Sequence, residues 1–409
     1  MSVFDSLIGQ AAVCRQLERA ACERGTAAMS HAWLFTGPPG SGRSLAARAL
    51  AAALQCETTD SPGCGQCHQC RTVMSGNHPD LTLMNAEGVM ITVEETRALV
   101  GESYESPSSG RYRIIIVEDA DRMSERTTNV LLKAIEEPPA FTVWMLCTPS
   151  LDDVLPTIRS RCRHVGLVVP PAEDVAQLLV SQGVDPQQAL VAARAAQSHI
   201  GRARGLVRDA GVWEDRQQVV REAVSVRGVG DAVYAAANIM EILDNATKRE
   251  ADSPSSLRGA SDASDAATSS PTKQSRGKKN ADDPELAEFK RQLGIAEGQN
   301  VPSALRKQVR DFEEKLKKRQ KRQSRDSLDR VMIDLLSVYR DVLIVQLGGE
   351  VDLMNIDFES DIRRIAAEST PEQSVRRIEA IGQARERLAG NGAPLLTLEA
   401  MMVALRPQG

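Results

Sequence analysis

The sequence predicts an α/β fold with a doubly wound, mostly parallel sheet, followed by helical regions. Two observations carry this prediction. Short apolar runs alternate with helical patterns over residues 31–169, as they do where helices connect parallel strands. The first of these runs, which begins at His31, leads into a glycine-rich turn and then into a helical pattern rich in alanine and leucine. From Pro170 onward the pattern is helical throughout, which predicts a smaller helical lid and a C-terminal helical domain.

Length and composition are those of a globular protein with more than one domain. The chain has 409 residues, of which 42% are hydrophobic. A formal net charge of −5 gives no overall basic field that would indicate nucleic acid binding by the whole chain. No apolar run is long enough to span a bilayer, and residues 1–10 lack the basic start and apolar centre of a signal peptide. We therefore expect a cytoplasmic protein that does not bind membranes.

The glycine-rich turn, GPPGSGRS over residues 37–44, has the spacing of a P-loop, in which backbone amides surround a phosphate chain. The helix that follows would direct the positive end of its dipole at the phosphates, and the Ser44 hydroxyl would hold magnesium. Arg43 stands where lysine is usual. Because arginine is planar and forked whereas lysine is a point charge, ATP and magnesium can still bind while hydrolysis is weakened. The alternative interpretation is an ordinary glycine-rich turn.

Four of the eight cysteines lie within fifteen residues, at Cys56, Cys64, Cys67 and Cys70. Their spacing, C-x7-C-x2-C-x2-C, allows four thiolates to close a tetrahedron around zinc. Because the protein would then fill every position on the metal, the predicted zinc is structural. A set of free thiols is the alternative, and His68 is expected to be a bystander.

A third strand is expected over residues 113–121, where consecutive apolar residues are followed by acids at the carboxyl end, including Glu118 and Asp119. In P-loop proteins, acids at this place support magnesium and polarise the attacking water. The usual order is aspartate and then glutamate, so the inverted order here is a second indication of weak hydrolysis. Alternatively, the two acids only solvate the end of a strand. Thr148 follows the strand expected over residues 142–147 and is a candidate for sensing the γ-phosphate.

The remaining patterns predict the domain organisation. We expect a nucleotide-binding domain over residues 1–168, a helical lid over 169–212, a C-terminal helical domain over 213–250 and 326–409, and a charged insert over 251–325. The fifth strand of the sheet is expected over His164–Val169. Residues 251–283 contain few large apolar side chains and are predicted to be disordered. Residues 306–325 hold ten Lys or Arg against three acids and are interpreted as an exposed helix with a solvated face, with a DNA contact as the alternative.

Several stretches resemble one family in sequence and in order. They are HAWLFTGPPGSGRS, the four-cysteine insert, GNHPDLTLM, LLKAIEEPP and IRSRC, all within residues 31–162. The set resembles the clamp-loader branch of the AAA+ ATPases, and within it the bacterial DNA polymerase III subunits called delta-prime and gamma/tau. The resemblance implies a P-loop AAA+ domain with a five-stranded parallel sheet, a helical lid and an all-α collar. It is weaker beyond about residue 210.

The resemblance also implies roles for individual residues. The phosphate loop would consist of Gly37, Pro38, Gly40, Gly42, Arg43 and Ser44. Glu118 and Asp119 would be the Walker B pair, Thr148 would be sensor 1, Arg204 would be sensor 2, and Arg161 would be the arginine finger. The zinc ligands would be Cys56, Cys64, Cys67 and Cys70. An arginine finger acts on ATP bound by the neighbouring subunit of a ring. The alternative for Arg161 is an ion pair within the chain, to an acid such as Asp153.

The implied function is that of an ATP-driven assembly that opens a sliding clamp and places it on primed DNA. Arg43 and the inverted acids weaken intrinsic hydrolysis and leave the finger intact, a combination that looks like delta-prime. The implied partners are the gamma/tau and delta subunits, the sliding clamp, and primer-template DNA contacted through the assembly. A working gamma/tau motor stays open as an alternative. A nucleotide kinase is another, although the sequence offers no evident acceptor pocket and gives the EEPP and SRC stretches no role in one.

Overall fold

The computed structural model describes residues 2–26, 29–58, 62–85, 90–252, 284–293, 295, 301–302 and 305–407. The chain divides into two compact units, one made of Met1–Trp213 with Leu336–Val375 and the other of Glu214–Leu335 with Arg376–Gly409. The lid, collar and insert boundaries expected from the sequence stay predictions. Disorder was predicted for residues 251–283, and of these, residues 253–283 lie outside the described ranges.

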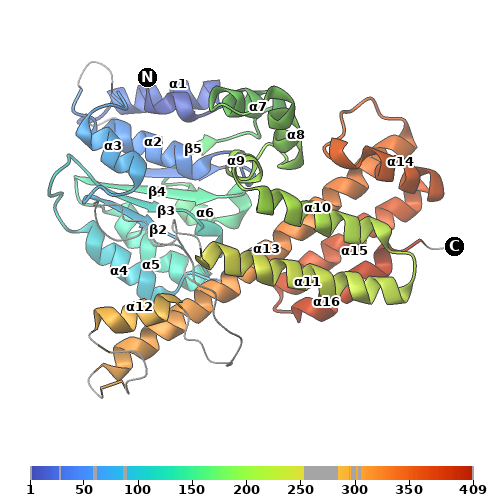
Figure 1. Cartoon of the computed structure of the whole chain (residues 1–409). Coiled ribbons are helices and arrows are strands. Elements are labelled where there is room, and N and C mark those ends of the chain that lie inside the picture. The colour runs from blue at the N-terminus through green and yellow to red at the C-terminus, as the bar shows by residue number, and fades with distance from the viewer. Residues whose placement is uncertain are drawn as a thin grey trace, which may run out of the picture. The chain divides into compact units, whose positions relative to one another are not determined.

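The first unit contains the predicted five-stranded parallel sheet, in the order β2-β3-β4-β1-β5 (Figure 1). The strands are β1 (Ala32–Thr36), β2 (Leu81–Met84), β3 (Arg113–Val117), β4 (Thr142–Thr148) and β5 (Arg163–Gly166). This order places β1, the strand before the glycine-rich turn, between β4 and β5, with Thr36 opposite Thr148. The carboxyl ends of β1, β3 and β4 therefore meet at one edge of the sheet, where open α/β folds bind ligands.

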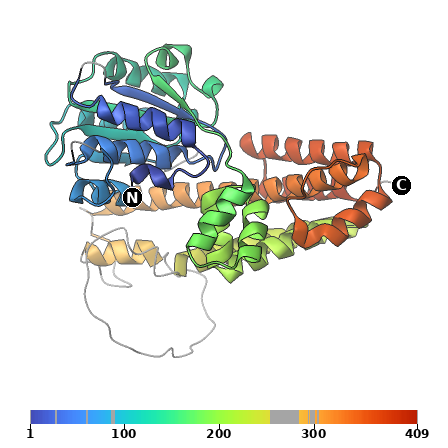
Figure 2. The same ribbon diagram turned by 90° about the horizontal axis from the view of Figure 1, so that it is seen from above.

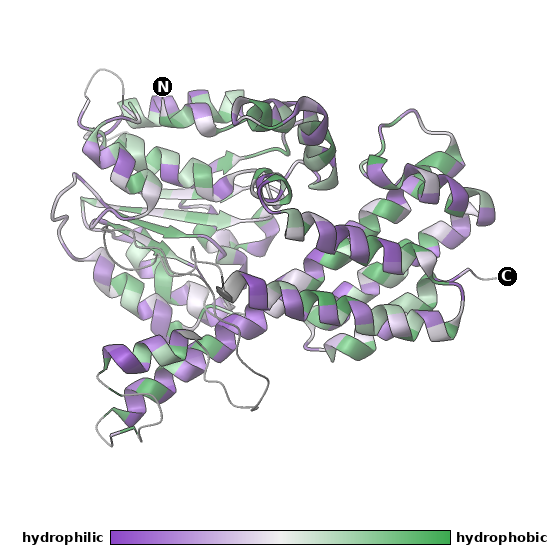
Figure 3. Cartoon of the chain, in the orientation of Figure 1, coloured by the Kyte–Doolittle hydropathy of each residue, from purple (hydrophilic) through white to green (hydrophobic). Residues whose placement is uncertain are grey.

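Side chains alternate between the two faces of the sheet, and helices cover each face (Figure 1). Trp33 and Phe35 face one helical layer, whereas Leu34 between them faces the other. The helices are α1 (Ala11–Cys22), α2 (Arg43–Gln55) and α3 (His68–Ser75) on the first face, and α4 (Val93–Ser103), α5 (Glu125–Glu136) and α6 (Pro156–Arg159) on the second. Both layers are apolar where they meet the strands, and the strands are mainly green in Figure 3.

The prediction for the fifth strand was wrong at both ends. A strand was expected over His164–Val169, but β5 runs from Arg163 to Gly166. Its partner β1 ends at Thr36, directly opposite Gly166, so the ladder has no further residues to pair with. Beyond it, the backbone of Val168 pairs with the side-chain amide of Gln10 instead of with a strand.

Short helices follow the sheet, as the sequence predicts. They are α7 (Ala172–Ser181), α8 (Pro186–Ala195) and α9 (Ile200–Arg208), which pack around a small core rich in alanine. The unit also includes the last part of α13 (Arg306–Leu347), then η4 (Ile356–Phe358) and α14 (Glu359–Glu368). Arg194 of α8 forms an ion pair with Asp352 at 2.6 Å, which ties the later segment to the lid helices.

The second unit is helical. It contains most of α10 (Ala210–Ser225), then α11 (Val229–Asp252), α12 (Pro284–Gln292), the first part of α13 (Arg306–Leu347), most of α15 (Pro371–Ala389) and α16 (Pro394–Leu405). The helical pattern over residues 213–250 forms two helices, α10 and α11. Between them, Asp231 accepts hydrogen bonds from the amides of Arg227 and Gly228. Helix α11 packs along α16. None of the described helices is both long enough and apolar enough to cross a membrane.

The second half of the charged insert expected over 251–325 contains two helices. Residues 306–325 are helical, as expected, and so are residues 284–292, which form α12 beside the first part of α13 (Figures 1 and 2). Phe289 stacks on Phe312, with 4.0 Å between ring centroids. Sparse apolar side chains at helical spacing are enough to form a small core here, which composition alone did not indicate.

Candidate functional site

The phosphate loop joins β1 to α2. Its glycines, Gly37, Gly40 and Gly42, have φ angles of 152°, 87° and 92°, a region that other residues rarely adopt. Gly42 immediately precedes α2, and no side chain within the described residues caps this helix. The first amides of α2 therefore keep their hydrogen-bonding capacity for an anion, and the helix dipole favours negative charge there.

A buried glutamine holds the loop to the end of β5. The Gln10 side chain donates to the carbonyl oxygen of Ser41 at 3.3 Å and to that of Val168 at 2.6 Å, and it accepts from the Val168 amide at 3.3 Å. The loop is also tied to β4, since the Gly37 amide donates to the carbonyl of Pro149 at 3.3 Å. The role of Gln10 was not predicted, because the sequence shows only a polar residue immediately before an amphipathic helix at this position.

The lid helix α9 begins against the phosphate loop. A Cβ atom at Gly40 would lie 2.8 Å from the Cα of His199, the residue that caps α9 and accepts a hydrogen bond from the Arg202 amide at 3.3 Å. Arg204 lies further along α9, and its Nε is buried without a hydrogen-bond partner in the described part of the chain. The sequence analysis selected Arg204 and overlooked His199, which stands just before the Gly-Arg-Ala-Arg stretch.

Glu118 and Asp119 follow β3, and each is engaged by an arginine of this chain. Arg48 Nη2 lies 2.9 Å from Glu118 Oε1, with 30% of the Arg48 and 17% of the Glu118 side chain exposed. Arg122 Nε lies 3.9 Å from Asp119 Oδ2. The sequence analysis missed Arg48. A signal was present, because it is an isolated arginine within the alanine- and leucine-rich α2, where a charge needs a partner.

These charges gather around the end of β4. Burial raises the pKa of the Cys147 thiol, Glu118 and Asp119 raise it further, and Arg43 and Arg48 act in the opposite direction. Cations and carboxylates of the chain itself thus share the edge of the sheet where a divalent metal would be expected. One Arg43 nitrogen, Nη1, is buried there without a hydrogen-bond partner among the described residues.

Asp121 belongs to the same group of charges. Burial raises the pKa of its carboxyl, and so does Asp119, whereas Arg122 and Arg43 lower it. A third acid therefore belongs to this group, and burial outweighs the effect of the two arginines on it.

Thr148 is buried at the carboxyl end of β4, as expected for a residue at the strand tip. Its hydroxyl donates to the carbonyl of Ser150 at 3.2 Å and to the Asp153 carboxylate at 3.4 Å. The Asp153 carboxylate also caps the following turn, accepting from the Ser150 amide at 2.9 Å. The sequence placed Thr148 correctly beside the phosphate loop but did not foresee these partners.

Arg161 lies after α6 and forms an ion pair within the chain, as the alternative interpretation expected. Its Nη2 atom is 2.6 Å from Glu136 Oε1, with 39% and 42% of the two side chains exposed. Its Nη1 donates to the carbonyl of Thr157 at 2.7 Å. The partner is Glu136 instead of Asp153, the acid named as an example, because Asp153 caps its own turn. The EEPP and SRC stretches therefore meet through Glu136 and Arg161.

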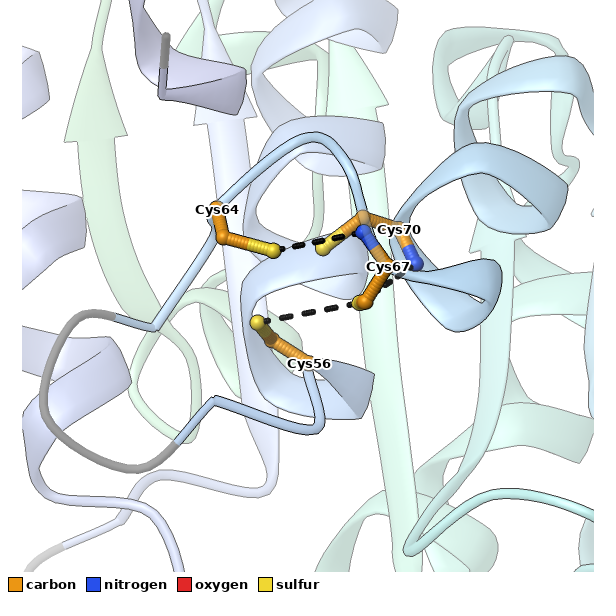
Figure 4. A group of neighbouring side chains, drawn as sticks. All are labelled: Cys56, Cys64, Cys67 and Cys70. Carbon is orange, nitrogen blue, oxygen red and sulfur yellow. Dashed lines mark hydrogen bonds between the residues drawn. The ribbon is translucent and has the colours of Figure 1, made fainter.

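The four cysteines converge at the other end of α2. Figure 4 shows their side chains turned toward one another, and all four sulfur atoms lie within 4.8 Å of each other. Cys56 follows α2, Cys67 caps α3, Cys70 lies within α3, and Cys64 comes from the loop before it. Sulfurs bound at about 2.3 Å to a tetrahedral zinc stand about 3.8 Å apart, so this arrangement fits zinc. His68 lies outside the cluster, as expected.

Backbone amides favour the thiolate form in part of this cluster. Burial works against the Cys56 thiolate, but the amides of Cys64, Gly63 and Thr58 outweigh burial and lower its pKa to about 6. The amides of Cys67 and Gln66 lower the pKa of Cys64 in the same way. Metal binding needs deprotonated sulfur, so the local backbone already prepares two of the four ligands.

Comparison with known proteins agrees with this geometry. Residues 9–170 match the family model described as DNA polymerase III, delta subunit. The delta-prime subunit of Bacillus subtilis is 32% identical over 193 residues, covering 47% of this chain and 58% of the relative. That of Pseudomonas aeruginosa is 33% identical over 181 residues, covering 40% and 55%. Less than half of the chain, its N-terminal part, is therefore similar to clamp-loader subunits of DNA polymerase III. It spans little more than half of these delta-prime relatives.

The clamp-loader family contains several kinds of subunit, and more than one matches this chain. The tau subunit of Salmonella typhimurium is 36% identical over 147 residues, covering 36% of this chain and 23% of the relative. Identity to delta-prime and to tau is similar. The comparisons therefore show similarity to clamp-loader subunits and do not distinguish a delta-prime subunit from a tau subunit.

The GNHPDLTLM stretch has a structural role. The Asp80 carboxylate is 1% exposed and accepts hydrogen bonds from the amides of Ser108, Ser109 and Gly110 at 2.6, 2.8 and 2.6 Å. Burial would raise its pKa, but these amides hold the pKa below its usual range. His78 contacts Gln69 of the cysteine-bearing helix α3 through its Nε2 atom. The stretch thus joins the loop before β3 to the region of the cysteine cluster.

Proposed function

We propose that the chain is a delta-prime-type subunit of a bacterial DNA polymerase III clamp loader. It would help to place the sliding clamp on primed DNA, in an assembly with gamma/tau and delta subunits. The observation that carries this proposal is the pairing of Glu118 with Arg48, which engages the first Walker B acid within the chain. A subunit of this kind contributes structure and an arginine to its neighbour while hydrolysing little ATP itself.

The phosphate loop fits a nucleotide better than it fits magnesium. Free amides at the start of α2 and the unpartnered Arg43 Nη1 are donors suited to phosphate oxygens. Magnesium requires oxygen ligands, and Ser44 would supply one of them. Glu118, however, would have to leave Arg48 before it could support the metal. Bound nucleotide would supply a phosphate chain that orders the loop, and this chain's own residues would do little to cleave it.

The cysteine cluster fits a structural zinc ion. Four sulfurs would close the coordination sphere, so the metal would have no open position for water. Bound zinc would join the end of α2 to α3. We propose no catalytic step at this site.

Arg161 is the residue proposed to act on a neighbouring subunit. It lies outside the group of charges at its own phosphate loop, is partly exposed, and is held by the surface acid Glu136. A forked guanidinium is suited to the γ-phosphate oxygens of ATP bound next door. The helices of the second unit would form the collar that holds the assembly together, and α7–α9 would form the lid.

Substitution of Arg161 in a reconstituted clamp loader tests the proposal. Trans-acting arginines contribute about a thousandfold or more to nucleotide hydrolysis, so Arg161→Ala should strongly reduce clamp- and DNA-stimulated ATP turnover. Arg159→Ala is the matched control, because Arg159 lies two residues away and pairs only with the exposed Asp152 at 3.4 Å. Unchanged turnover in an assembled Arg161→Ala complex would remove the residue from catalysis.

A gamma/tau motor is the second candidate. The formed phosphate loop and the 36% identity to a tau subunit favour it. A motor would turn over ATP with magnesium as the purified chain, whereas a delta-prime-type subunit would not.

A further inference from the structure

The first part of α13, residues 306–325, is here called the basic segment, and neither the phosphate loop nor the cysteine cluster explains it. Helix α12 lies beside it (Figure 2). Val309, Phe312 and Leu316 lie on one side of the basic segment at spacings of three and four residues, and they pack with Leu286 and Phe289 of α12. The segment therefore has one covered face, and most of its other residues are exposed.

The open side is strongly basic. Between residues 315 and 325 the sequence holds seven Lys or Arg and no acid, in a chain whose net charge is −5. In Figure 3 this part of α13 is mostly purple. At about 100° per residue these seven positions occupy almost every direction except that of Leu316. The basic segment is thus a helix with positive charge on most of its sides, and it packs against α12.

Most arginines on this pair of helices have acidic partners, whereas three neighbouring lysines between residues 315 and 325 do not. Arg310 pairs with Glu314 at 3.3 Å and Arg319 with Glu285 at 2.8 Å. Lys317, Lys318 and Lys321 are exposed, and no acid in the described part of the chain pairs with them.

This arrangement weakens the helix on its own. Lys317 and Lys321 are four residues apart, a like-charge spacing that costs a helix a few tenths of a kcal/mol. A polyanion bound along the segment would remove that repulsion. The charge pattern therefore indicates an external partner with many closely spaced negative charges.

We propose that the basic segment binds the phosphate backbone of double-stranded DNA through Lys317, Lys318 and Lys321. From Lys307 to Arg325 the helix extends about 27 Å at 1.5 Å per residue. Duplex DNA presents one negative charge per about 1.7 Å of its axis, so several lysines can contact phosphates at once. Flexible lysine ammonium groups hold phosphates without reading bases, so binding is independent of sequence.

The aromatic residues favour a duplex over a single strand. Single strands are bound by stacking their bases on exposed aromatic rings. Residues 284–293 and 306–325 contain two aromatic residues, Phe289 and Phe312, and these stack on each other with an interplanar angle of 11°. No ring in these two ranges is left to receive a base. This DNA contact does not rest on the nucleotide chemistry of the phosphate loop.

Binding of the full chain to a fluorescent duplex of about 30 base pairs tests the proposal, with fluorescence anisotropy as the readout. The triple variant Lys317→Gln, Lys318→Gln, Lys321→Gln should bind at least about tenfold more weakly near 0.1 M salt. The slope of log K against log salt concentration should become shallower by about 2.7, since each phosphate contact contributes about 0.9. The charge-preserving variant Lys317→Arg, Lys318→Arg, Lys321→Arg should bind like the unmodified chain.

The matched control removes three exposed charges from other helices of the second unit. Lys248→Gln, Arg376→Gln, Arg387→Gln makes the same change in net charge and should alter binding less than twofold. An equal loss with this control would overturn the proposal, because net charge alone would then explain the binding. Polyglutamate competing as well as the duplex, or a single strand binding more tightly than the duplex, would also overturn it.

Discussion

The cysteine cluster and the charged edge of the sheet at the phosphate loop lie at opposite ends of α2, and they use their reactive side chains differently. In the cluster, four cysteines converge within 4.8 Å of each other. At the edge, Glu118 is paired with Arg48, and Asp119 lies near Arg122. The cysteine cluster therefore offers four ligands to a metal ion. At the edge of the sheet, by contrast, arginines of the same chain compensate the charges of the carboxylates.

The difference shows that a site can have the backbone shape of a nucleotide-binding loop while its acidic side chains are not free to bind a metal. Zinc can enter the cluster without displacing a competing cation. Magnesium at the other end must first break a hydrogen-bonded ion pair that is largely shielded from solvent. We therefore expect metal to be structural at one end of α2 and hydrolysis to be weak at the other.

The largest effect is expected when the cluster is broken. Cys64→Ser with Cys67→Ser removes two of four zinc ligands, and the chain should lose one zinc per molecule and melt at a clearly lower temperature. Structural zinc contributes about 10 kcal/mol or more of binding free energy in small zinc-finger peptides, so even part of that loss is measurable. Metal analysis and thermal unfolding check this result.

Cys14→Ser with Cys22→Ser is the control, because both residues lie outside the cluster. This variant should keep its zinc. Full zinc content in the Cys64 and Cys67 double variant would contradict the assignment of these ligands.

A smaller effect is expected from Gly40→Ala in the phosphate loop. Its new Cβ would lie 2.8 Å from the His199 Cα, a backbone atom that cannot turn aside, and its φ is +87°. Gly42→Ala is a matched control, since φ is +92° there and nothing lies within 4 Å of the new Cβ. Strain alone should cost about 1 to 2 kcal/mol of unfolding free energy at both positions, and Gly40→Ala should cost more. Chemical denaturation without nucleotide measures both, and equal costs would mean that α9 does not rest on the loop.

The smallest of these effects is expected from Asp80→Asn, which weakens the support of the cysteine region. The substitution exchanges a charged acceptor of several hydrogen bonds for an amide and should cost about 2 kcal/mol near neutral pH. Because folding lowers the Asp80 pKa, its contribution is fully present above the ordinary carboxyl pKa and is lost as pH falls through the lowered value. Denaturation near pH 7 and near pH 3 should show the difference between the two proteins shrinking in acid. A constant difference would mean that the carboxylate charge is not what matters.

Much of the α/β part could be predicted from local patterns. The apolar run before the phosphate loop became β1. The strand expected over residues 113–121 became β3 but ends at Val117, before the acids. The cysteine spacing alone indicated a cluster that the fold then assembled. These features are local, because a few consecutive residues are enough to indicate a strand, a turn or a closely spaced set of ligands.

The features that were missed depend on residues far apart in the chain. Arg48 and Glu118 are 70 residues apart, and Gln10 and Val168 are 158 apart. Their pairing follows from the strand order, which places β1 between β4 and β5 and cannot be read from periodicity. The partner of Arg161 was missed for the same reason, because Glu136 comes from another helix.

The most direct test of the central claim is ATP turnover by the purified chain with magnesium. The unmodified chain should bind nucleotide and turn it over very slowly or not at all, because Arg43 and the paired, inverted acids misplace the groups that hydrolysis needs. Arg43→Lys combined with Glu118→Asp and Asp119→Glu restores the usual motor pattern and should raise turnover. Turnover by the unmodified chain at the rate of a motor subunit, unchanged by these three substitutions, would contradict the account and make gamma/tau the better description.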